Sequence, residues 1–317
     1  MLEKIHPLFK LIMFACFSFL SMIIFTFLGF LITGAIYDMN IQEMMELSGL
    51  ISTNPDALLP EDVNILKMNQ FFQASGLFLV PAILAGYFFS KSFKSFLYFR
   101  RTPGGISIGM TILIIVMMYP FIMFLKEINT YLLDLVLSEN NSLKAMGKNM
   151  EMVTEKMLGT DSFSGIITNI IVIAMLPAVA EELFFRGVVQ RLLVDWIKNH
   201  HIAIIITAIL FSTFHMEFYS YLPRVAIGIV FGYMVVWSKS IWLPVIAHFI
   251  NNFAAVMLYY FFGVPEMKEM ESYGFNVFNL LMVLFSVLFL GFALFYLYRI
   301  EKKKSSGPER TNNPETN

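Results

Sequence analysis

The feature that most constrains this 317-residue chain is a series of long apolar stretches. A helix needs about 20 mostly apolar residues to cross the hydrocarbon core of a bilayer. The fifth and sixth stretches of the series are short and have polar edges. The sequence therefore predicts an all-α, polytopic membrane bundle of about eight transmembrane helices. They are residues 11–36, 66–89, 106–125, 164–190, 202–216, 221–238, 241–262 and 275–298.

The composition supports a membrane protein and excludes other classes. Charged residues make up only 14% of the chain, against roughly 25% in soluble domains. The formal net charge of -1 argues against nucleic-acid binding, which needs a concentrated basic face. Cys16 is the only cysteine, so no internal disulfide can form. The first stretch is longer than the ~7–15-residue core of a signal peptide, and we expect it to remain as the first span.

Lys and Arg gather in every second connection between the predicted spans, whereas the other connections are acidic or mixed. Because cytoplasmic loops carry an excess of Lys and Arg, eight spans with both termini in the cytoplasm satisfy this pattern. The long third connection, 126–162, contains two segments with helical apolar spacing, YLLDLVL and MEMVTEKML, which we expect on the outer interface. We expect residues 1–304 to form one multi-pass domain in the cell (plasma) membrane and residues 305–317 to be a disordered polar tail.

The fourth stretch contains three ionisable residues in the segment AVAEELFFRGVV, at 178–189. A charged side chain at the centre of a spanning helix costs about 2.5–3.5 kcal/mol on insertion scales, so these groups must face one another or other polar groups. Glu182 and Arg186 are four residues apart and share a helix face, which predicts a supporting ion pair. Glu181 lies about 100° around the helix and is left as a free carboxylate.

A histidine at matching depth follows in the fifth stretch, which ends FSTFH. Glu181 precedes Lys198, near the turn of the predicted hairpin, by 17 residues, and His215 follows Lys198 by 17 (198 − 181 and 215 − 198). An antiparallel hairpin therefore brings Glu181 and His215 to the same level.

The seventh stretch contains PVIAHFINNF, in which His248 and Asn252 share a helix face. These two lie somewhat closer to the cytoplasmic end than Glu181, by a mismatch that helix tilt can absorb. Pro177 and Pro244 each precede a polar residue by four positions, and we expect each to kink its helix and admit water. The sequence predicts a polar cavity that opens towards the cytoplasm.

A water molecule, a base and donors aimed at a developing oxyanion are the parts of a hydrolase. Glu181 suits the base, His215 can orient the water, and His248 with the Asn252 amide can bind the oxyanion. Alternatively, Glu181, His215 and His248 can hold a divalent metal, of which zinc suits these ligands best. The chain lacks the HExxH pattern of many zinc proteases, so mechanisms with and without metal both remain open.

These residues carry a family resemblance. EELFFR, FSTFH and HFINN match the EExxxR, FxxxH and HxxxN motifs of the CAAX-protease and bacteriocin-processing (CPBP, or Abi-type) intramembrane endopeptidases. The order and spacing of the motifs are also similar over about residues 165–260, including a helix with Gly228 and Gly232. The resemblance implies a membrane protease, with a core at about 165–262, similar to the endopeptidases that trim prenylated CAAX proteins.

The resemblance also implies roles for single residues and a class of partner. We expect a peptide or membrane-protein substrate, and the metal is left open. Carried over by position, the motifs make Glu181 and His215 the water-activating pair, His248 and Asn252 the groups on the oxyanion or metal side, and Glu182 and Arg186 the supports.

Two other classes of function compete with a protease. Intramembrane ionisable groups also mark ion and proton paths, but a repeat-built transporter would show matched broken helices in both halves, and here the polar groups gather in one half. A non-catalytic bacteriocin-immunity protein is the third class. Outside the cluster, we expect Arg224 to extend to the membrane interface.

Overall fold

The computed structural model describes residues 2–137, 141–160, 162–271, 274 and 276–306. The described residues form helices and no strand, which confirms the predicted all-α fold. The α-helices are α1 (Pro7–Tyr37), α2 (Ile41–Thr53), α3 (Pro60–Ala74), α4 (Val80–Phe88), α5 (Phe93–Phe96), α6 (Gly105–Val136), α7 (Ser142–Leu158), α8 (Phe163–Asn169), α9 (Leu176–Glu182), α10 (Arg191–Ile197), α11 (His200–Phe214), α12 (Tyr221–Ser238), α13 (Trp242–Glu271) and α14 (Val277–Ser306).

Wide π-helical turns join several of these α-helices into longer rods. Ser75–Leu79 joins α3 to α4, while Ile170–Met175 and Leu183–Gln190 join α8, α9 and α10. The second rod is therefore one continuous helix, Phe163–Ile197, which we call the central helix. A π turn is frequent at functional sites, and two of the three flank the EE pair in the central helix.

Within the described residues, seven helices are long and apolar enough to cross a membrane, and they confirm seven of the eight predicted stretches. The fifth stretch, α11, has 15 residues and is only about 22 Å long, short of the ~30 Å hydrocarbon core. The seven are Pro7–Tyr37, Pro60–Phe88, Gly105–Val136, Phe163–Ile197, Phe218–Ser238, Trp242–Gly263 and Val277–Lys304.

The short fifth helix ends because the chain reverses inside the bundle. Met216 has a left-handed backbone, with φ of 54°, and Phe218–Ser220 forms a 3-10 turn that leads into α12. Asn129 of α6 holds this reversal, because its amide donates to the carbonyls of Phe218 and Tyr219 at 2.7 and 3.0 Å. His215 therefore lies at a clamped turn rather than inside a complete span.

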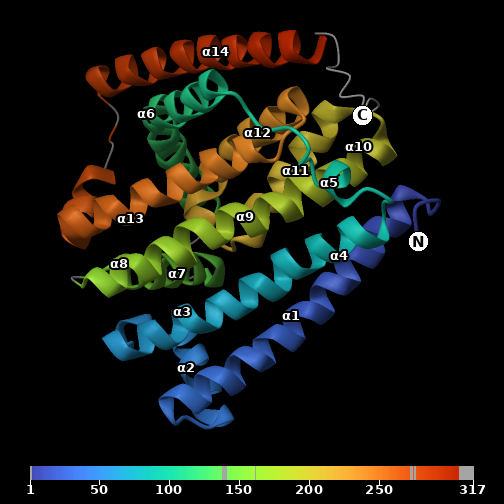
Figure 1. Cartoon of the computed structure of the whole chain (residues 1–317). Coiled ribbons are helices and arrows are strands. Elements are labelled where there is room, and N and C mark those ends of the chain that lie inside the picture. The colour runs from blue at the N-terminus through green and yellow to red at the C-terminus, as the bar shows by residue number, and fades with distance from the viewer. Residues whose placement is uncertain (1, 138–140, 161, 272–273, 275, 307–317) are drawn as a thin grey trace.

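The helices are stacked side by side, and the central helix lies in the middle of the stack (Figure 1). The rod made of α3 and α4 packs on one side of it, and α11, α12 and α13 pack on the other. α14 lies against α6 at one edge, and α1 lies against α3 and α4 at the opposite edge. The candidate residues thus sit at the most enclosed part of the bundle.

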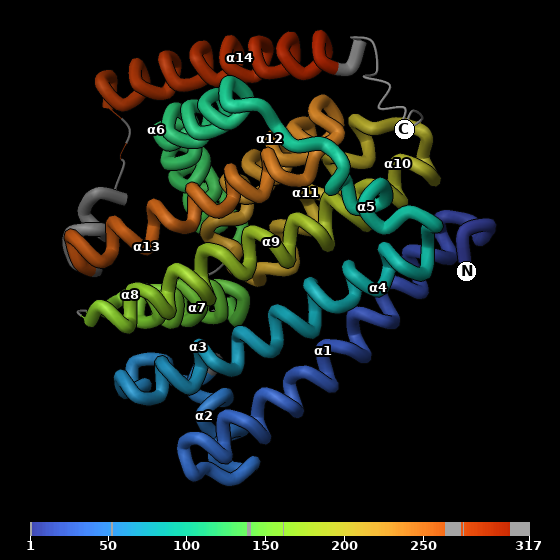
Figure 2. The backbone as a smooth tube through the Cα atoms, viewed as in Figure 1, coloured from blue at the N-terminus to red at the C-terminus, as the bar shows by residue number. Residues whose placement is uncertain are grey.

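The two ends of the bundle differ in charge. The N-terminal end of α1, α5 and α10 lie together at one end, and α2 and α7 lie at the other (Figure 2). The first end carries the basic connections, including Lys94, Lys198, Lys239 and Lys304. The structure thus gathers the basic connections at one end, whereas the assignment of that end to the cytoplasm stays a prediction.

The structure adds detail to two of the predicted connections. YLLDLVL does not form a separate interfacial segment, because α6 continues through it to Val136. MEMVTEKML lies within α7, which packs on α2 and α3. After the last motif, α13 breaks at Gly263, with φ of 80°, and continues to Glu271. Most of the expected polar tail, from 307 onwards, lies outside the described residues.

Candidate active site

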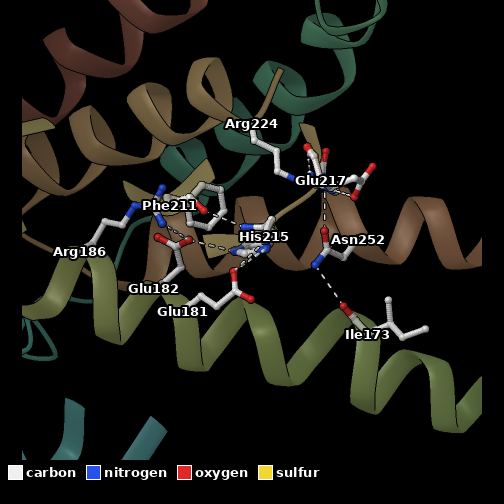
Figure 3. Close-up of polar contacts among 11 residues, drawn as sticks. Ile173, Glu181, Glu182, Arg186, Phe211, His215, Glu217, Arg224 and Asn252 are labelled. Atoms are coloured by element: carbon white, nitrogen blue, oxygen red, sulfur yellow. Dashed lines mark hydrogen bonds and ion pairs between the residues drawn. The ribbon is translucent and has the colours of Figure 1, made fainter. Parts of the chain in front are cut away.

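The three ionisable residues of the segment AVAEELFFRGVV point into the protein (Figure 3). Only 8% of Glu181 is exposed, and Glu182 and Arg186 are completely buried. Measured along the helix, Glu181 lies about 27 Å from Phe163 and about 24 Å from Ile197. The cluster therefore lies near the middle of the longest apolar helix. The free-energy cost of burying its charges must be offset by polar partners inside the bundle.

One carboxylate oxygen of Glu182 lies within hydrogen-bond distance of two other side chains. The Arg186 guanidinium donates to Glu182 Oε1 at 2.9 Å, which is the ion pair expected from the four-residue spacing. His248 Nδ1 lies 2.9 Å from the same oxygen. Spacing within one helix could not reveal this second contact, because it depends on how α13 is rotated against the central helix.

Aromatic rings surround Arg186. Its guanidinium carbon lies 4.5 Å from the centre of the Phe211 ring, 5.5 Å from Phe231 and 6.0 Å from Phe185. Cation–π attraction is strongest where the cation is desolvated, and one Nη2–H also donates to the Gly228 carbonyl at 3.4 Å. Arg186 is thus sealed into the scaffold and out of reach of a substrate.

Two glycines of α12 allow this close packing. A Cβ at Gly228 would meet Ala208 Cβ at 3.0 Å, and one at Gly232 would lie 2.8 Å from both Gln190 Oε1 and Ile204 Cγ2. The Gly232 carbonyl also accepts a hydrogen bond from Gln190 Nε2 at 3.1 Å. α12 can approach α11 and the central helix this closely only because these side chains are absent.

Replacing Gly232 by Ala is expected to destabilise the bundle by about 1–3 kcal/mol, because the new methyl group would overlap two buried groups. The midpoint of thermal unfolding in detergent measures the effect. The matched control is Gly291→Ala in α14, where a Cβ would meet nothing within 4 Å. Equal midpoints for the two variants would contradict this account of the packing.

The free carboxylate converges with both motif histidines. Glu181 Oε2 lies 3.7 Å from His215 Nε2 and 4.0 Å from His248 Nε2. This oxygen is buried and has no hydrogen-bond partner among the described residues. His215 is 26% exposed at its side chain, so the site is open on that side. The structure brings together Glu181 and His215, which the sequence placed at one level, and also His248, which it placed somewhat closer to the cytoplasmic end.

The second nitrogen of each imidazole is already engaged. His215 Nδ1 lies 2.8 Å from the Phe211 carbonyl, and His248 Nδ1 contacts Glu182. Because a backbone carbonyl only accepts hydrogen bonds, His215 Nδ1 carries the proton, and we assign the same tautomer to His248 from its carboxylate partner. In the neutral rings, both Nε2 lone pairs therefore face Glu181.

The FxxxH spacing has a physical reason at the end of α11. The last four carbonyls of a helix lack intrahelical donors, and Phe211 is one of these four because α11 ends at Phe214. The His215 side chain, four residues on, supplies a donor to that carbonyl. The contact fixes the ring so that Nε2 faces the central helix.

The groups around Glu181 suit zinc by their chemistry but not by their present spacing. Two imidazole nitrogens and a carboxylate oxygen are suitable ligands, and each imidazole has the outer hydrogen bond that zinc-binding histidines usually have. As they lie here, however, no three His, Cys, Asp or Glu side chains of the described residues form a metal-binding group. Ligand atoms around a tetrahedral zinc are about 3.3 Å apart, so Glu181, His215 and His248 fit by chemistry but would have to close by several tenths of an ångström.

Asn252 makes a contact that the sequence did not suggest. Its Nδ2 donates to the Ile173 carbonyl in the central helix at 3.1 Å, and its Oδ1 accepts from Asn251 at 3.2 Å. One amide N–H is therefore directed at the backbone before Glu181, while the oxyanion role implied by the resemblance stays an expectation.

The prolines also differ from each other. Pro177 lies inside the central helix, directly after a π turn. Pro244 lies in the first turn of α13, which begins at Trp242, where a missing N–H breaks no helical hydrogen bond. The expected kink at Pro244 is therefore wrong, because the helix starts just before it.

Arg224 has a partner within the protein, and its expected position at the membrane interface stays a prediction. It forms an ion pair with Glu217, and its Nη1 also donates to the Glu217 carbonyl at 3.3 Å. The two side chains are 22% and 15% exposed and lie near His215 (Figure 3). The ion pair connects α12 to the turn after His215. Spacing along one helix does not predict this contact, because Glu217 lies beyond the end of α11.

Comparison with known proteins identifies the same region. Residues 163–254 match a family described as type II CAAX prenyl endopeptidase Rce1-like. The chain carries an Rce1-like domain. All three motifs fall inside it, so the predicted resemblance is confirmed. Together with the seven apolar helices, the domain supports an integral, multi-pass membrane protein.

One curated relative was found beside the family. The uncharacterized protein YpbD of Bacillus subtilis (strain 168) is 32% identical over 88 residues, which cover 26% of this chain and 42% of that protein. The chain thus aligns with less than half of the length of this relative. No solved structure matches the chain.

Proposed function

We propose that the Rce1-like domain hydrolyses a peptide bond with Glu181 as the general base. The convergence of Glu181 Oε2 with two imidazole Nε2 atoms, at 3.7 and 4.0 Å, carries the proposal. One water can donate to two acceptors about 4.5 Å apart when both hydrogen bonds are about 2.8–2.9 Å long. A water held between Glu181 and His215 fits this separation after a small adjustment.

The steps follow from the positions of the groups. Glu181 takes a proton from the water while His215 Nε2 orients it, and the resulting hydroxide attacks the carbonyl carbon of the scissile bond. Protonated His248 can donate from Nε2 to the oxyanion, and the Glu182 carboxylate stabilises that positive charge. Glu181 then returns its proton to the leaving amine nitrogen, which completes the hydrolysis.

The metal is a separate part of the proposal. A divalent ion, zinc by ligand type, would be held by Glu181, His215 and His248 and would supply Lewis-acid polarisation and a more acidic water. All other tasks belong to the chain itself: Glu182 and Arg186 hold His248 in place, and the Phe211 carbonyl orients His215.

The substrate is proposed to be a peptide segment of a membrane-associated protein. Glu181 stands near the middle of the central helix, so the scissile bond must enter the bundle rather than remain in the aqueous loops. Matched peptides with and without a prenyl group would determine whether the relation to CAAX endopeptidases extends to the lipid.

The test is cleavage of a peptide library by the purified full chain in detergent, with and without chelator, analysed by mass spectrometry. We expect discrete cleavage products from the wild type and none from Glu181→Gln. Loss of products on chelation and their return with zinc would assign the metal to the site, whereas products that persist would assign water activation to the side chains alone. Equal products from wild type and variant would overturn the proposal.

A further inference from the structure

The central helix has a backbone defect four residues before Glu181. Pro177 has no N–H, so the carbonyl four residues earlier, that of Ile173, loses its regular helical donor. The preceding π turn widens the gap, because the Leu176 N–H bonds to Ile171, five residues back. An unpaired carbonyl is costly in hydrocarbon, and a helix without this bond bends easily.

Asn252 supplies the missing donor from another helix. Its Nδ2 reaches the Ile173 carbonyl at 3.1 Å, in the place of the N–H that Pro177 lacks. One turn earlier on α13, His248 bonds to Glu182. α13 is therefore fastened to the central helix on both sides of Glu181, once before Pro177 and once just after Glu181.

We propose that Asn252 is a positioning residue that completes the backbone at Pro177 and thereby fixes the rotation of Glu181 relative to both histidines. Its catalytic part rests on the proposed function. Glu181 is one turn beyond Pro177, so bending or twisting of the helix at this point moves Oε2 directly. The separations of Oε2 from the two Nε2 atoms, 3.7 and 4.0 Å here, therefore depend on the local geometry of the helix at Pro177.

The proposal makes Asn252 and Pro177 energetically dependent on each other. In Pro177→Ala the new N–H can donate to the helix backbone. The hydrogen bond from the Asn252 amide to the Ile173 carbonyl then contributes less to stability. Asn252→Leu, which keeps the branched shape of the side chain and removes the donor, is expected to lower the midpoint of thermal unfolding by roughly 2–4 °C in the wild type. On the Pro177→Ala background the loss is expected to fall to less than half of that.

The thermal measurements are made in the full chain with Glu181→Gln as well as with Glu181 intact. Because this arm needs no activity, its result stands even where the proposed reaction fails. Asn251→Leu is the matched control: Asn251 is the neighbouring amide and bonds to Asn252 rather than to the kink, so its effect is expected to be the same in the wild type and on the Pro177→Ala background. An equal loss for Asn252→Leu on both backgrounds would overturn the proposal.

Cleavage kinetics separate positioning from direct contact with the oxyanion. Asn252→Leu is expected to lower kcat at least tenfold with little change in KM, and Pro177→Ala is expected to restore most of this loss. If the Asn252 amide donated to the oxyanion, a new backbone N–H at position 177 could not take its place. A kcat that stays low in the double variant would therefore show that Asn252 contacts the reacting atoms. If Pro177→Ala alone proves inactive, the thermal cycle still decides the coupling.

Discussion

Replacing Glu181 by Gln is expected to lower the rate of peptide cleavage by about 10²–10⁴-fold, the usual contribution of a general base. Glutamine keeps the size and shape of the side chain but cannot accept a proton from water. Because Glu181 Oε2 has no hydrogen-bond partner among the described residues, the change breaks no internal bond. The unfolding midpoint is therefore expected to stay within a degree or two of the wild type.

The cleavage assay with purified protein measures this effect. Two further variants serve as a graded substitution and as a control. Glu181→Asp retains a carboxylate but withdraws it by one methylene, so an intermediate rate is expected. Glu61→Gln, at an exposed carboxylate in the first turn of α3, is expected to leave the rate unchanged. Wild-type cleavage by Glu181→Gln would exclude this residue as the base.

The contacts that the sequence predicts are those set by spacing along one helix or one hairpin. Glu182 and Arg186 pair because they are four residues apart, and Glu181 meets His215 because the hairpin returns the chain to the same level. Both relations follow from the helical repeat and from the position of the turn. They hold although α11 is too short to cross the membrane.

The contacts that the sequence does not predict depend on how helices rotate against each other. Asn252 and His248 share a face of α13, so they were expected to act together at one oxyanion. In the structure they bind different points of the central helix, the Ile173 carbonyl and the Glu182 carboxylate. The signal for the first contact was present in Pro177, because an intramembrane proline leaves a carbonyl that some donor must satisfy.

The ion pair of Glu217 and Arg224 is another contact that spacing along the sequence does not predict. A lone arginine near a predicted helix end is compatible with an interfacial position, and its partner is visible only when the short turn after His215 is known. Spacing alone cannot locate this turn, because the apolar pattern of 202–216 does not show where the helix ends within the bundle depth.

Replacing Glu182 by Gln is expected to cause the largest loss of stability in the chain. The change leaves Arg186, which is completely buried, without its carboxylate, and an uncompensated buried charge typically costs about 3–5 kcal/mol. Chemical or thermal unfolding in detergent measures the loss. The matched control is Glu217→Gln in the partly exposed pair with Arg224, where contact of both side chains with solvent makes the expected loss smaller.

The double variant Glu182→Leu, Arg186→Met separates stability from function. It removes both charges and fills their space with apolar atoms, and such replacements are often neutral or stabilising, so most of the unfolding free energy is expected to return. Cleavage is not expected to return, because His248 then has no carboxylate to orient its Nδ1 and to stabilise a proton on its ring. A double variant that folds and also cleaves at the wild-type rate would show that the Glu182–His248 contact is dispensable. The buried ion pair would then serve folding alone.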